Sequence, residues 1–334
     1  MIAALKPHPT LKPGLASLIS ILTPQLNELN TCIVAKMQSP VSLISQIAGY
    51  LVSLGGKRLR PLLTVASAEL CGYQGKRHIY LAACVEFIHT ATLLHDDVVD
   101  ESTLRRGMST ANSVWSNKAS VLVGDFLFSR AFKLMVQDGS LEVLHILSQA
   151  SSAIAEGEVL QLSSSHDLNL DEETYLKIIE SKTARLFSAA TEVGTIVAEA
   201  EDPKRKALSR FGHTLGMAFQ LMDDVLDYAA DQEKLGKSVG DDFREGKVTL
   251  PVVIAYKQGI DREFWEEAFH NGVRDRNALT HAIRLLKESG ALLKTKHKAQ
   301  VFIEEALECL TVFPESPLKT ALEDLAYFSL CREG

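Results

Sequence analysis

The stretch LLHDDVVDESTLRRG, residues 93–107, joins an apolar run to three aspartates and then to a pair of arginines. On a helix, residues three or four positions apart lie on one face, so Asp96, Asp97 and Asp100 would line the end of an apolar helix. The acids could be a solvated helix end, with the arginines as surface partners. Clustered carboxylates repel one another, however, so the alternative is that these acids bind metal ions that neutralise them.

The same pattern appears a second time, as QLMDDVLD at residues 220–227. Two copies in matched contexts favour a metal site over a solvated surface. Oxygen ligands without histidine or cysteine suit magnesium, which takes few carboxylates, several waters and phosphate oxygens. If the two helices face each other, the sequence predicts magnesium ions on both sides of one diphosphate. Two sets of acids would hold them: Asp96, Asp97 and Asp100, and Asp223, Asp224 and Asp227.

Apolar residues recur at helical spacing through most of the chain, as in residues 81–94, 121–136 and 215–228. Stretches rich in β-branched residues, 42–48 and 249–256, lack hairpin signals, so buried helices explain them better than strands. No segment has the composition of a linker. The sequence therefore predicts an all-α fold.

The composition is that of a globular protein, with 46% hydrophobic and 23% charged residues among 334. A net charge of −7 argues against a nucleic-acid partner, because such binding needs a basic field. The apolar runs are too short for a membrane span, and the first residues do not resemble a secretory signal. Five cysteines without paired short spacings are typical of free thiols, so we expect a cytoplasmic protein.

Basic residues accompany glycines in SLGGKRLRP, residues 53–61, ahead of a predicted helix start. Lys57 and Arg60 there have the side chains that phosphate oxygens accept, although a basic surface turn is the alternative. His89 lies two helical turns before Asp96, on the acidic face, where a core histidine is the alternative.

Further polar groups interrupt apolar helices. Lys182 and Thr183 lie in SKTARLF, and Gln220 directly precedes the second acidic pattern. Downstream, the glycine-punctuated stretch 235–251 predicts either a lid over the site or a solvated loop. Taken one by one, these groups could be incidental.

Together the motifs resemble those of the trans-isoprenyl diphosphate synthases, most closely the long-chain polyprenyl group. The matching motifs occur in the family order: GGKRLRP, VEFIHTATLLHDDVVDESTLRRG, GDFLFSRAF, KTARLF, FQLMDDVLDY and GKSVGDDFREGKVTLP. The resemblance implies an all-α isoprenoid synthase fold, a single large helical bundle around a central apolar cavity, usually found as a homodimer. It implies one domain over 1–334, with an N-terminal extension at 1–40, a catalytic core at 41–258 and C-terminal helices at 259–334.

The resemblance also assigns roles by position, with about three Mg²⁺ per site. The first cluster would be Asp96 and Asp100, supported by Asp97, and the second Asp223 with Asp224 and Asp227. Isopentenyl diphosphate would be bound by Lys57, Arg60, His89 and Arg106. An allylic diphosphate such as farnesyl diphosphate would be bound by Arg105, Lys182, Thr183, Gln220, Lys237 and Lys247. The catalytic residues would be Asp96, Asp100, Lys182 and Asp223.

The implied reaction needs no nucleophilic side chain. Magnesium and cationic groups stabilise the charge on the departing diphosphate, so the allylic bond from C1 to oxygen ionises. The double bond of isopentenyl diphosphate attacks the cation, and a proton is lost to the released diphosphate. The product would be a long chain of the octaprenyl class, expected to serve as a quinone side chain. Because the product is apolar with a charged head, its release would involve peripheral contact with a membrane.

Product length should be decided on the apolar side of the first acidic cluster. Ala91 and Thr92 are small, which predicts an open tunnel, with Phe126, Phe128 and Phe132 as candidates for its floor. Alternatively, Ala91 and Thr92 only allow close helix packing.

Three other functions remain open. A short-chain farnesyl or geranylgeranyl synthase would share every motif. A terpene cyclase usually carries an Asn/Ser/Glu pattern where this chain has DDVLD. A non-catalytic partner subunit commonly has damaged metal motifs, whereas both copies are intact here.

Overall fold

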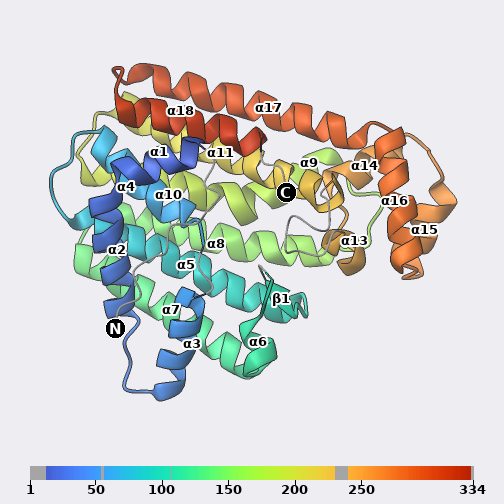
Figure 1. The fold of residues 1–334 in the computed structure, drawn as a ribbon, viewed down its shortest axis with the longest axis horizontal. Coiled ribbons are helices and arrows are strands. Elements are labelled where there is room, and N and C mark those ends of the chain that lie inside the picture. Colours follow the sequence, from blue (N-terminus) through green and yellow to red (C-terminus); the bar gives the residue numbers. More distant parts are fainter. Residues whose placement is uncertain (1–12, 54–55, 106, 230–239, 332–334) are drawn as a thin grey trace.

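The computed structural model describes residues 13–53, 56–105, 107–229 and 240–331, which are mostly helical (Figure 1). The first elements in chain order are α1 (Pro13–Ile21), α2 (Thr23–Lys36), α3 (Ser42–Ser53), α4 (Leu59–Leu70), α5 (Arg77–Val99), β1 (Leu104–Arg105), β2 (Met108–Ser109), α6 (Ala111–Val114), α7 (Asn117–Asp138) and α8 (Leu141–Ser163). The rest are α9 (Glu172–Ile179), η1 (Glu180–Ala184), α10 (Arg185–Val197), α11 (Asp202–Ala229), α13 (Asp241–Glu245), α14 (Leu250–Lys257), α15 (Arg262–His270), α16 (Arg276–Glu288), α17 (Ala291–Cys309), η2 (Leu310–Val312) and α18 (Pro317–Leu330). The predicted all-α fold is confirmed.

Local sequence signals account for several helix starts. The side chains of Ser116, Ser140 and Asp171 accept backbone N–H bonds at the starts of α7, α8 and α9. Such caps satisfy donors that the first helical turn leaves without a partner. The two β-branched stretches form α3 and α14, as predicted. In α14, burial of Val252 and Val253 outweighs their modest preference for strands.

One short hairpin was not foreseen from the sequence. β1 and β2 pair antiparallel, with Leu104 opposite Ser109 and Arg105 opposite Met108. Gly107 in the turn has φ of 75°, a left-handed conformation that glycine adopts without a steric penalty. Strands of two residues are too short to leave an alternating pattern. The hairpin returns the chain toward the end of α5.

Long helices pack side by side to form the core. α5 lies against α7 and α4, and α10 lies against α4 and α11. Phe87, Phe187 and Phe211, at most 1% exposed, belong to one connected cluster of buried apolar residues. Burying each such ring contributes about 1.5–3 kcal/mol relative to exposing it. Figure 1 shows α17 and α18 along one edge of the bundle and α13 to α16 gathered at one end.

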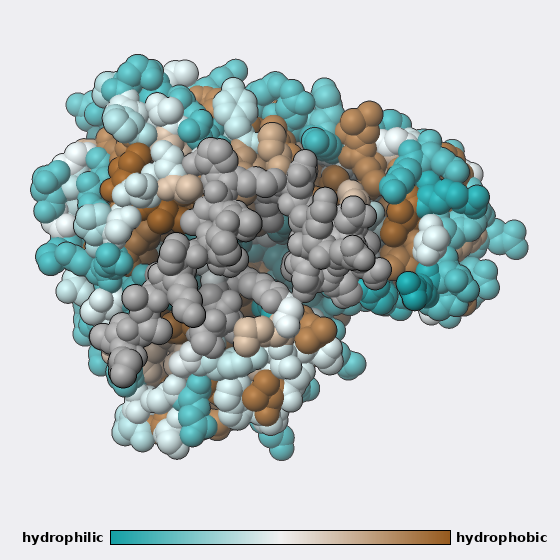
Figure 2. All heavy atoms as spheres, in the orientation of Figure 1, coloured by the Kyte–Doolittle hydropathy of each residue, from teal (hydrophilic) through white to brown (hydrophobic). Residues whose placement is uncertain are grey.

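The surface is mixed in character. Figure 2 shows hydrophilic residues around much of the periphery of one face, with smaller groups of hydrophobic residues between them. None of the described helices is both long enough and apolar enough to span a bilayer.

Candidate active site

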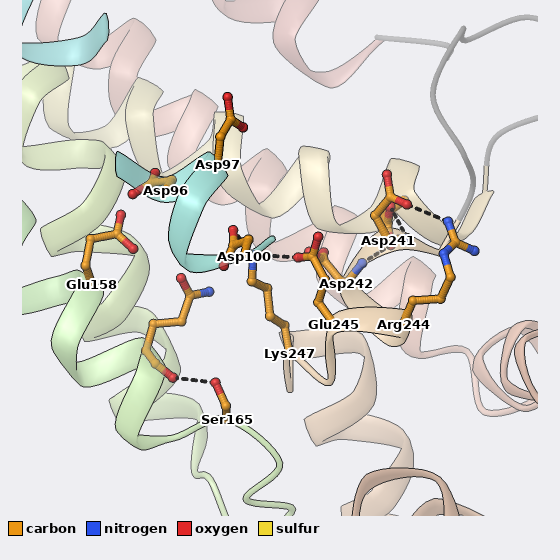
Figure 3. Close-up of polar contacts among 12 residues, drawn as sticks. Asp96, Asp97, Asp100, Glu158, Ser165, Asp241, Asp242, Arg244, Glu245 and Lys247 are labelled. Carbon is orange, nitrogen blue, oxygen red and sulfur yellow. Dashed lines mark hydrogen bonds and ion pairs between the residues drawn. The ribbon is translucent and has the colours of Figure 1, made fainter. Parts of the chain in front are cut away.

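The first acidic cluster lies at the C-terminal end of α5. Asp96 and Asp97 belong to its last turn, and Asp100 caps it, donating its N–H to the Asp96 carbonyl at 2.8 Å. Figure 3 shows Asp97 pointing away from Asp100. Asp97 is 4% exposed and accepts bonds of 2.8 and 2.7 Å from the Arg105 guanidinium. The pair holds the hairpin against α5, which leaves Asp96 and Asp100 as the candidate metal ligands of this cluster.

Asp96 lies in a setting that favours a nearby cation. Burial raises the pKa of Asp96 to about 7, Lys182 at 4.0 Å opposes the rise, and Glu158 and Asp100 add to it. A carboxyl group so placed is stabilised in its ionised form by additional positive charge. Figure 3 shows Glu158 beside Asp96.

The described residues fit magnesium that arrives with a phosphorylated substrate. Among them, no group of three or more His, Cys, Asp and Glu side chains is arranged to hold a metal ion by itself. Magnesium does not need such a cage, because it keeps several waters and takes phosphate oxygens as ligands. The acids of α5 and α11 would therefore supply only part of its coordination.

The ammonium group of Lys182 is held by α8. It donates to Oε2 of Glu158 and to Oε1 of Gln161, each at 2.7 Å. The side chains of Lys182 and Glu158 are 23% and 28% exposed. Sequence reasoning missed Glu158 and Gln161, although residues three apart share a helical face and GEVLQL carries that signal.

Lys182 and Thr183 belong to a π-helical turn, η1, between α9 and α10. Such turns are rare and occur frequently at functional sites. The flanking helices approach it at glycines. A Cβ atom built on Gly157 of α8 would lie 2.8 Å from an atom of η1, and one on Gly216 of α11 would lie 2.7 Å away. The close approach of both helices fixes the place of η1.

In the second acidic cluster, Asp224 points into the protein. It is 3% exposed and accepts a 2.5 Å bond from the Tyr175 hydroxyl and a 2.8 Å bond from the Gln220 amide. The Gln220 oxygen accepts the Thr183 hydroxyl at 2.9 Å. Burial raises the pKa of Asp224, and repulsion from Asp242 adds to the rise. Both Asp224 oxygens are thus engaged within the fold, which argues against the metal role predicted for it.

Asp223 and Asp227 lie one helical turn apart on α11, and each is half-buried. The carboxylate of Asp227 accepts the backbone N–H groups of Asp241 and Asp242 at the start of α13, each at 3.1 Å. Burial raises the pKa of Asp227 to about 8, and repulsion from Asp242 adds to the rise. Asp227 therefore attaches α13 to the end of α11.

Lys247, just after α13, contacts the first cluster. Its ammonium lies 2.7 Å from Oδ2 of Asp100 and 2.7 Å from Glu245 (Figure 3). Burial opposes the charge of Lys247, but Asp100 and Glu245 more than offset it and hold its pKa above the usual value. The segment that Asp227 attaches to the end of α11 therefore reaches Asp100 at the end of α5. Lys237, assigned to the same substrate, lies outside the described residues.

Two of the four residues assigned to isopentenyl diphosphate lie together. Nη1 of Arg60 on α4 is 3.0 Å from Nε2 of His89 on α5. The Arg60 guanidinium also lies 4.5 Å from the ring centroid of Phe187. Lys57 is exposed, with its ammonium over an aromatic ring of α18. Arg106 lies outside the described residues.

The predicted length-determining residues have different environments. Ala91 is fully buried, whereas Thr92 is half-buried and donates its hydroxyl to a backbone carbonyl of the preceding turn at 2.8 Å. Phe126 and Phe128 are half-buried on α7. Phe132 is 46% exposed, so the suggestion that it closes a tunnel inside this chain is not supported.

Comparison with known proteins identifies the family. Residues 41–286 match the model of polyprenyl synthetases. The chain is 46% identical over 306 residues to octaprenyl diphosphate synthase of Escherichia coli (strain K12), covering 91% of this chain and 94% of the relative. It is 43% identical over 299 residues to an all-trans-nonaprenyl-diphosphate synthase (geranyl-diphosphate specific) of Rhodobacter capsulatus, covering 89% and 91%.

A solved structure resembles the whole chain. The polyprenyl synthase of Caulobacter crescentus CB15, complexed with calcium and isoprenyl diphosphate, has a TM-score of 0.93 and 48% identity, covering 98% of this chain and 100% of that one. The family and that complex indicate a divalent metal and isoprenyl diphosphate substrates. The chain belongs to the polyprenyl synthetase family, prenyltransferases of all-helical fold that condense isopentenyl diphosphate with allylic diphosphates.

Proposed function

We propose that this chain is a magnesium-dependent trans-prenyltransferase that extends farnesyl diphosphate to a product of the octaprenyl class. One observation supports the site assignment: Lys247 lies 2.7 Å from Asp100 at the end of α5, in a segment that Asp227 attaches to the end of α11. Lys182 lies 4.0 Å from Asp96 at the same place. Each lysine that would bind phosphate thus lies within 4.0 Å of an aspartate that would bind metal.

The residues divide the work of ionising the allylic substrate. Bound magnesium would supply positive charge to the leaving diphosphate, held by Asp96, Asp100 and Asp223. Lys182 and Lys247 would bind the same diphosphate and stabilise the charge that develops as the bond from C1 to oxygen breaks. Asp224 would orient Gln220 through the hydrogen bond between them, and Gln220 would in turn orient the hydroxyl of Thr183.

The second substrate would be bound by the pair formed by Arg60 and His89. Arginine binds phosphate in two-pronged fashion, and contact with His89 fixes its direction. The double bond of isopentenyl diphosphate would then attack C1 of the allylic cation. A proton is lost to the diphosphate that has left, which balances the charge. Asp97 and Arg105 would keep the hairpin in place beside this site.

The length of the product is proposed from the small residues near the site. Ala91 leaves more room beside α5 than an aromatic side chain would, which supports a long product. The relatives at 46% and 43% identity are named for octaprenyl and nonaprenyl products. A quinone side chain is the proposed use of such a product.

We propose a homodimer in the cytoplasm. Large apolar side chains on α7 and α8 are exposed, with fractions of 63–81%: Leu122, Val136, Leu141, Val159 and Leu162. Exposed apolar groups on consecutive helices are typical of an association surface. The five cysteines are free thiols, which suits a reducing compartment. Release of the apolar product would involve peripheral contact with a membrane. We also propose that residues 1–334 form one polyprenyl synthase domain.

Incubation of the purified chain with farnesyl diphosphate and labelled isopentenyl diphosphate tests the activity. We expect label in a long linear product with Mg²⁺, and none with excess EDTA. A cyclic hydrocarbon without label would identify a terpene cyclase instead. Activity that requires a second protein would identify a partner subunit. Light scattering tests the dimer, with a mass twice that of the chain as the expected result.

A further inference from the structure

Two polar residues of α8 have no role in the function proposed so far. Glu158 and Gln161 lie three positions apart, on the face of α8 that meets η1, and both accept from Lys182 at 2.7 Å. Neither belongs to the two acidic patterns. Both lie near the first metal cluster, because both bind Lys182, whose ammonium is 4.0 Å from Asp96.

The geometry leaves Lys182 partly available to a ligand. An ammonium group has three donors, and two of them are used on Glu158 and Gln161. The carboxylate of Asp96 lies 4.0 Å from Nζ, which is beyond hydrogen-bond range. The third donor is therefore left for an oxygen atom that approaches between Lys182 and Asp96.

We propose that Glu158 and Gln161 are positioning residues that keep Lys182 away from Asp96 and aimed at the allylic diphosphate. A lysine side chain is long and flexible, and without these partners its ammonium would move onto the nearby carboxylate. Asp96 would then be neutralised by Lys182 rather than by a metal ion. This inference rests on the proposed function, since it assigns a purpose to the same site.

The backbone supports the same arrangement. Gly157 precedes Glu158, and a Cβ atom there would lie 3.0 Å from the backbone nitrogen of Lys182. The bare Cα lets α8 approach η1 closely enough for both side chains to reach Nζ. Lys182 is thus fixed at both ends: packing fixes its backbone, and two hydrogen bonds fix Nζ.

Replacement of Glu158 separates this role from a purely structural one. For Glu158→Ala we expect a rise of about ten- to a hundredfold in KM for farnesyl diphosphate, the range of a lost hydrogen bond to a charged group. KM for isopentenyl diphosphate should stay unchanged. Glu158→Gln keeps an oxygen acceptor and the side-chain volume, so part of the loss should be recovered. Glu156→Gln is the matched control, because Glu156 is exposed on the same helix and accepts from Ser152.

Metal binding without turnover gives a second readout. Mn²⁺ titrated into protein that holds a thiolo analogue of farnesyl diphosphate, and followed by electron paramagnetic resonance, should bind more weakly to Glu158→Ala than to Glu156→Gln. In the Lys182→Ala background, Glu158→Ala should have no further effect on KM for farnesyl diphosphate, because no ammonium is left to position.

The outcomes separate the two proposals. Wild-type protein that elongates nothing would refute the proposed function. If the wild type elongates, two results would overturn the positioning role. One is a KM for farnesyl diphosphate that Glu158→Ala raises further in the Lys182→Ala background. The other is unchanged KM and Mn²⁺ affinity in both Glu158→Gln and Glu158→Ala. Should the alanine variant lose its helical circular dichroism, the same two measurements on the isosteric Glu158→Gln decide the question.

Discussion

Replacement of Gly157 by alanine tests whether close packing of α8 against η1 sets the position of Lys182. The new Cβ atom would lie 2.8 Å from the Ser181 Cβ and 3.0 Å from the Lys182 backbone nitrogen. Neither contact involves the flexible end of a side chain, so α8 and η1 must separate by several tenths of an ångström. Gly49 in α3 provides a matched control, because a Cβ there meets nothing within 4 Å.

The two substitutions should change stability in opposite directions. Alanine for glycine within a helix stabilises by about 0.5–1 kcal/mol, and Gly49→Ala should show this gain. At Gly157 the same gain is opposed by overpacking, which costs about 1–3 kcal/mol. The net effect of Gly157→Ala should therefore be a loss of up to about 2.5 kcal/mol, read from urea unfolding followed by circular dichroism.

The two substitutions should also differ in their effect on KM. Displacement of η1 moves Lys182, so Gly157→Ala should raise KM for the allylic diphosphate several-fold more than it raises KM for isopentenyl diphosphate. Gly49→Ala should leave both unchanged. If Gly157→Ala proves as stable and as active as Gly49→Ala, packing of α8 does not determine the position of Lys182.

Three further changes test other parts of the site. Asp96→Asn or Asp223→Asn should lower turnover by orders of magnitude with unchanged circular dichroism; near-normal turnover would remove the metal assignment. Ala91→Phe should shorten the product on a chromatogram, and an unchanged length would place the tunnel floor elsewhere. Burial raises the pKa of Asp96 from 3.8 to about 7, against the opposing effect of Lys182. Protonation of Asp96 therefore stabilises the metal-free fold. This stabilisation is complete below pH 3.8 and is lost as the pH rises through about 7. Because Mg²⁺ binds the ionised form, it should raise the calorimetric melting temperature more at pH 8 than at pH 6; an equal rise at both would contradict this linkage.

Helical periodicity was enough to predict the fold class and the two acidic helix ends. Asp96, Asp100 and Asp223 could be found because they recur at fixed spacing next to apolar residues, and that information is local. The repeated motif predicted one shared site only if the two helices faced each other. Lys247, in the segment after α13, contacts Asp100, and the shared metal site stays a prediction.

Contacts between distant segments could not be predicted in this way. The direction of Asp224 depends on Tyr175, which is 49 positions away in the sequence. The partners of Lys182 lie 21 and 24 positions away on α8. The π-helical turn depends on packing against α8 and α11, because nothing in SKTARLF specifies an extra residue per turn. These features arise from tertiary packing, so a single helix pattern does not encode them.

The central claim is that the ends of α5 and α11 hold metal ions around one diphosphate. Anomalous diffraction from crystals grown with Mn²⁺ and a thiolo analogue of farnesyl diphosphate tests it most directly. We predict manganese peaks bound by Asp96 and Asp100 on one side of the diphosphate and by Asp223 on the other, with Lys182 on a phosphate oxygen. Manganese bound elsewhere, or a diphosphate seated away from these three carboxylates, would contradict the account.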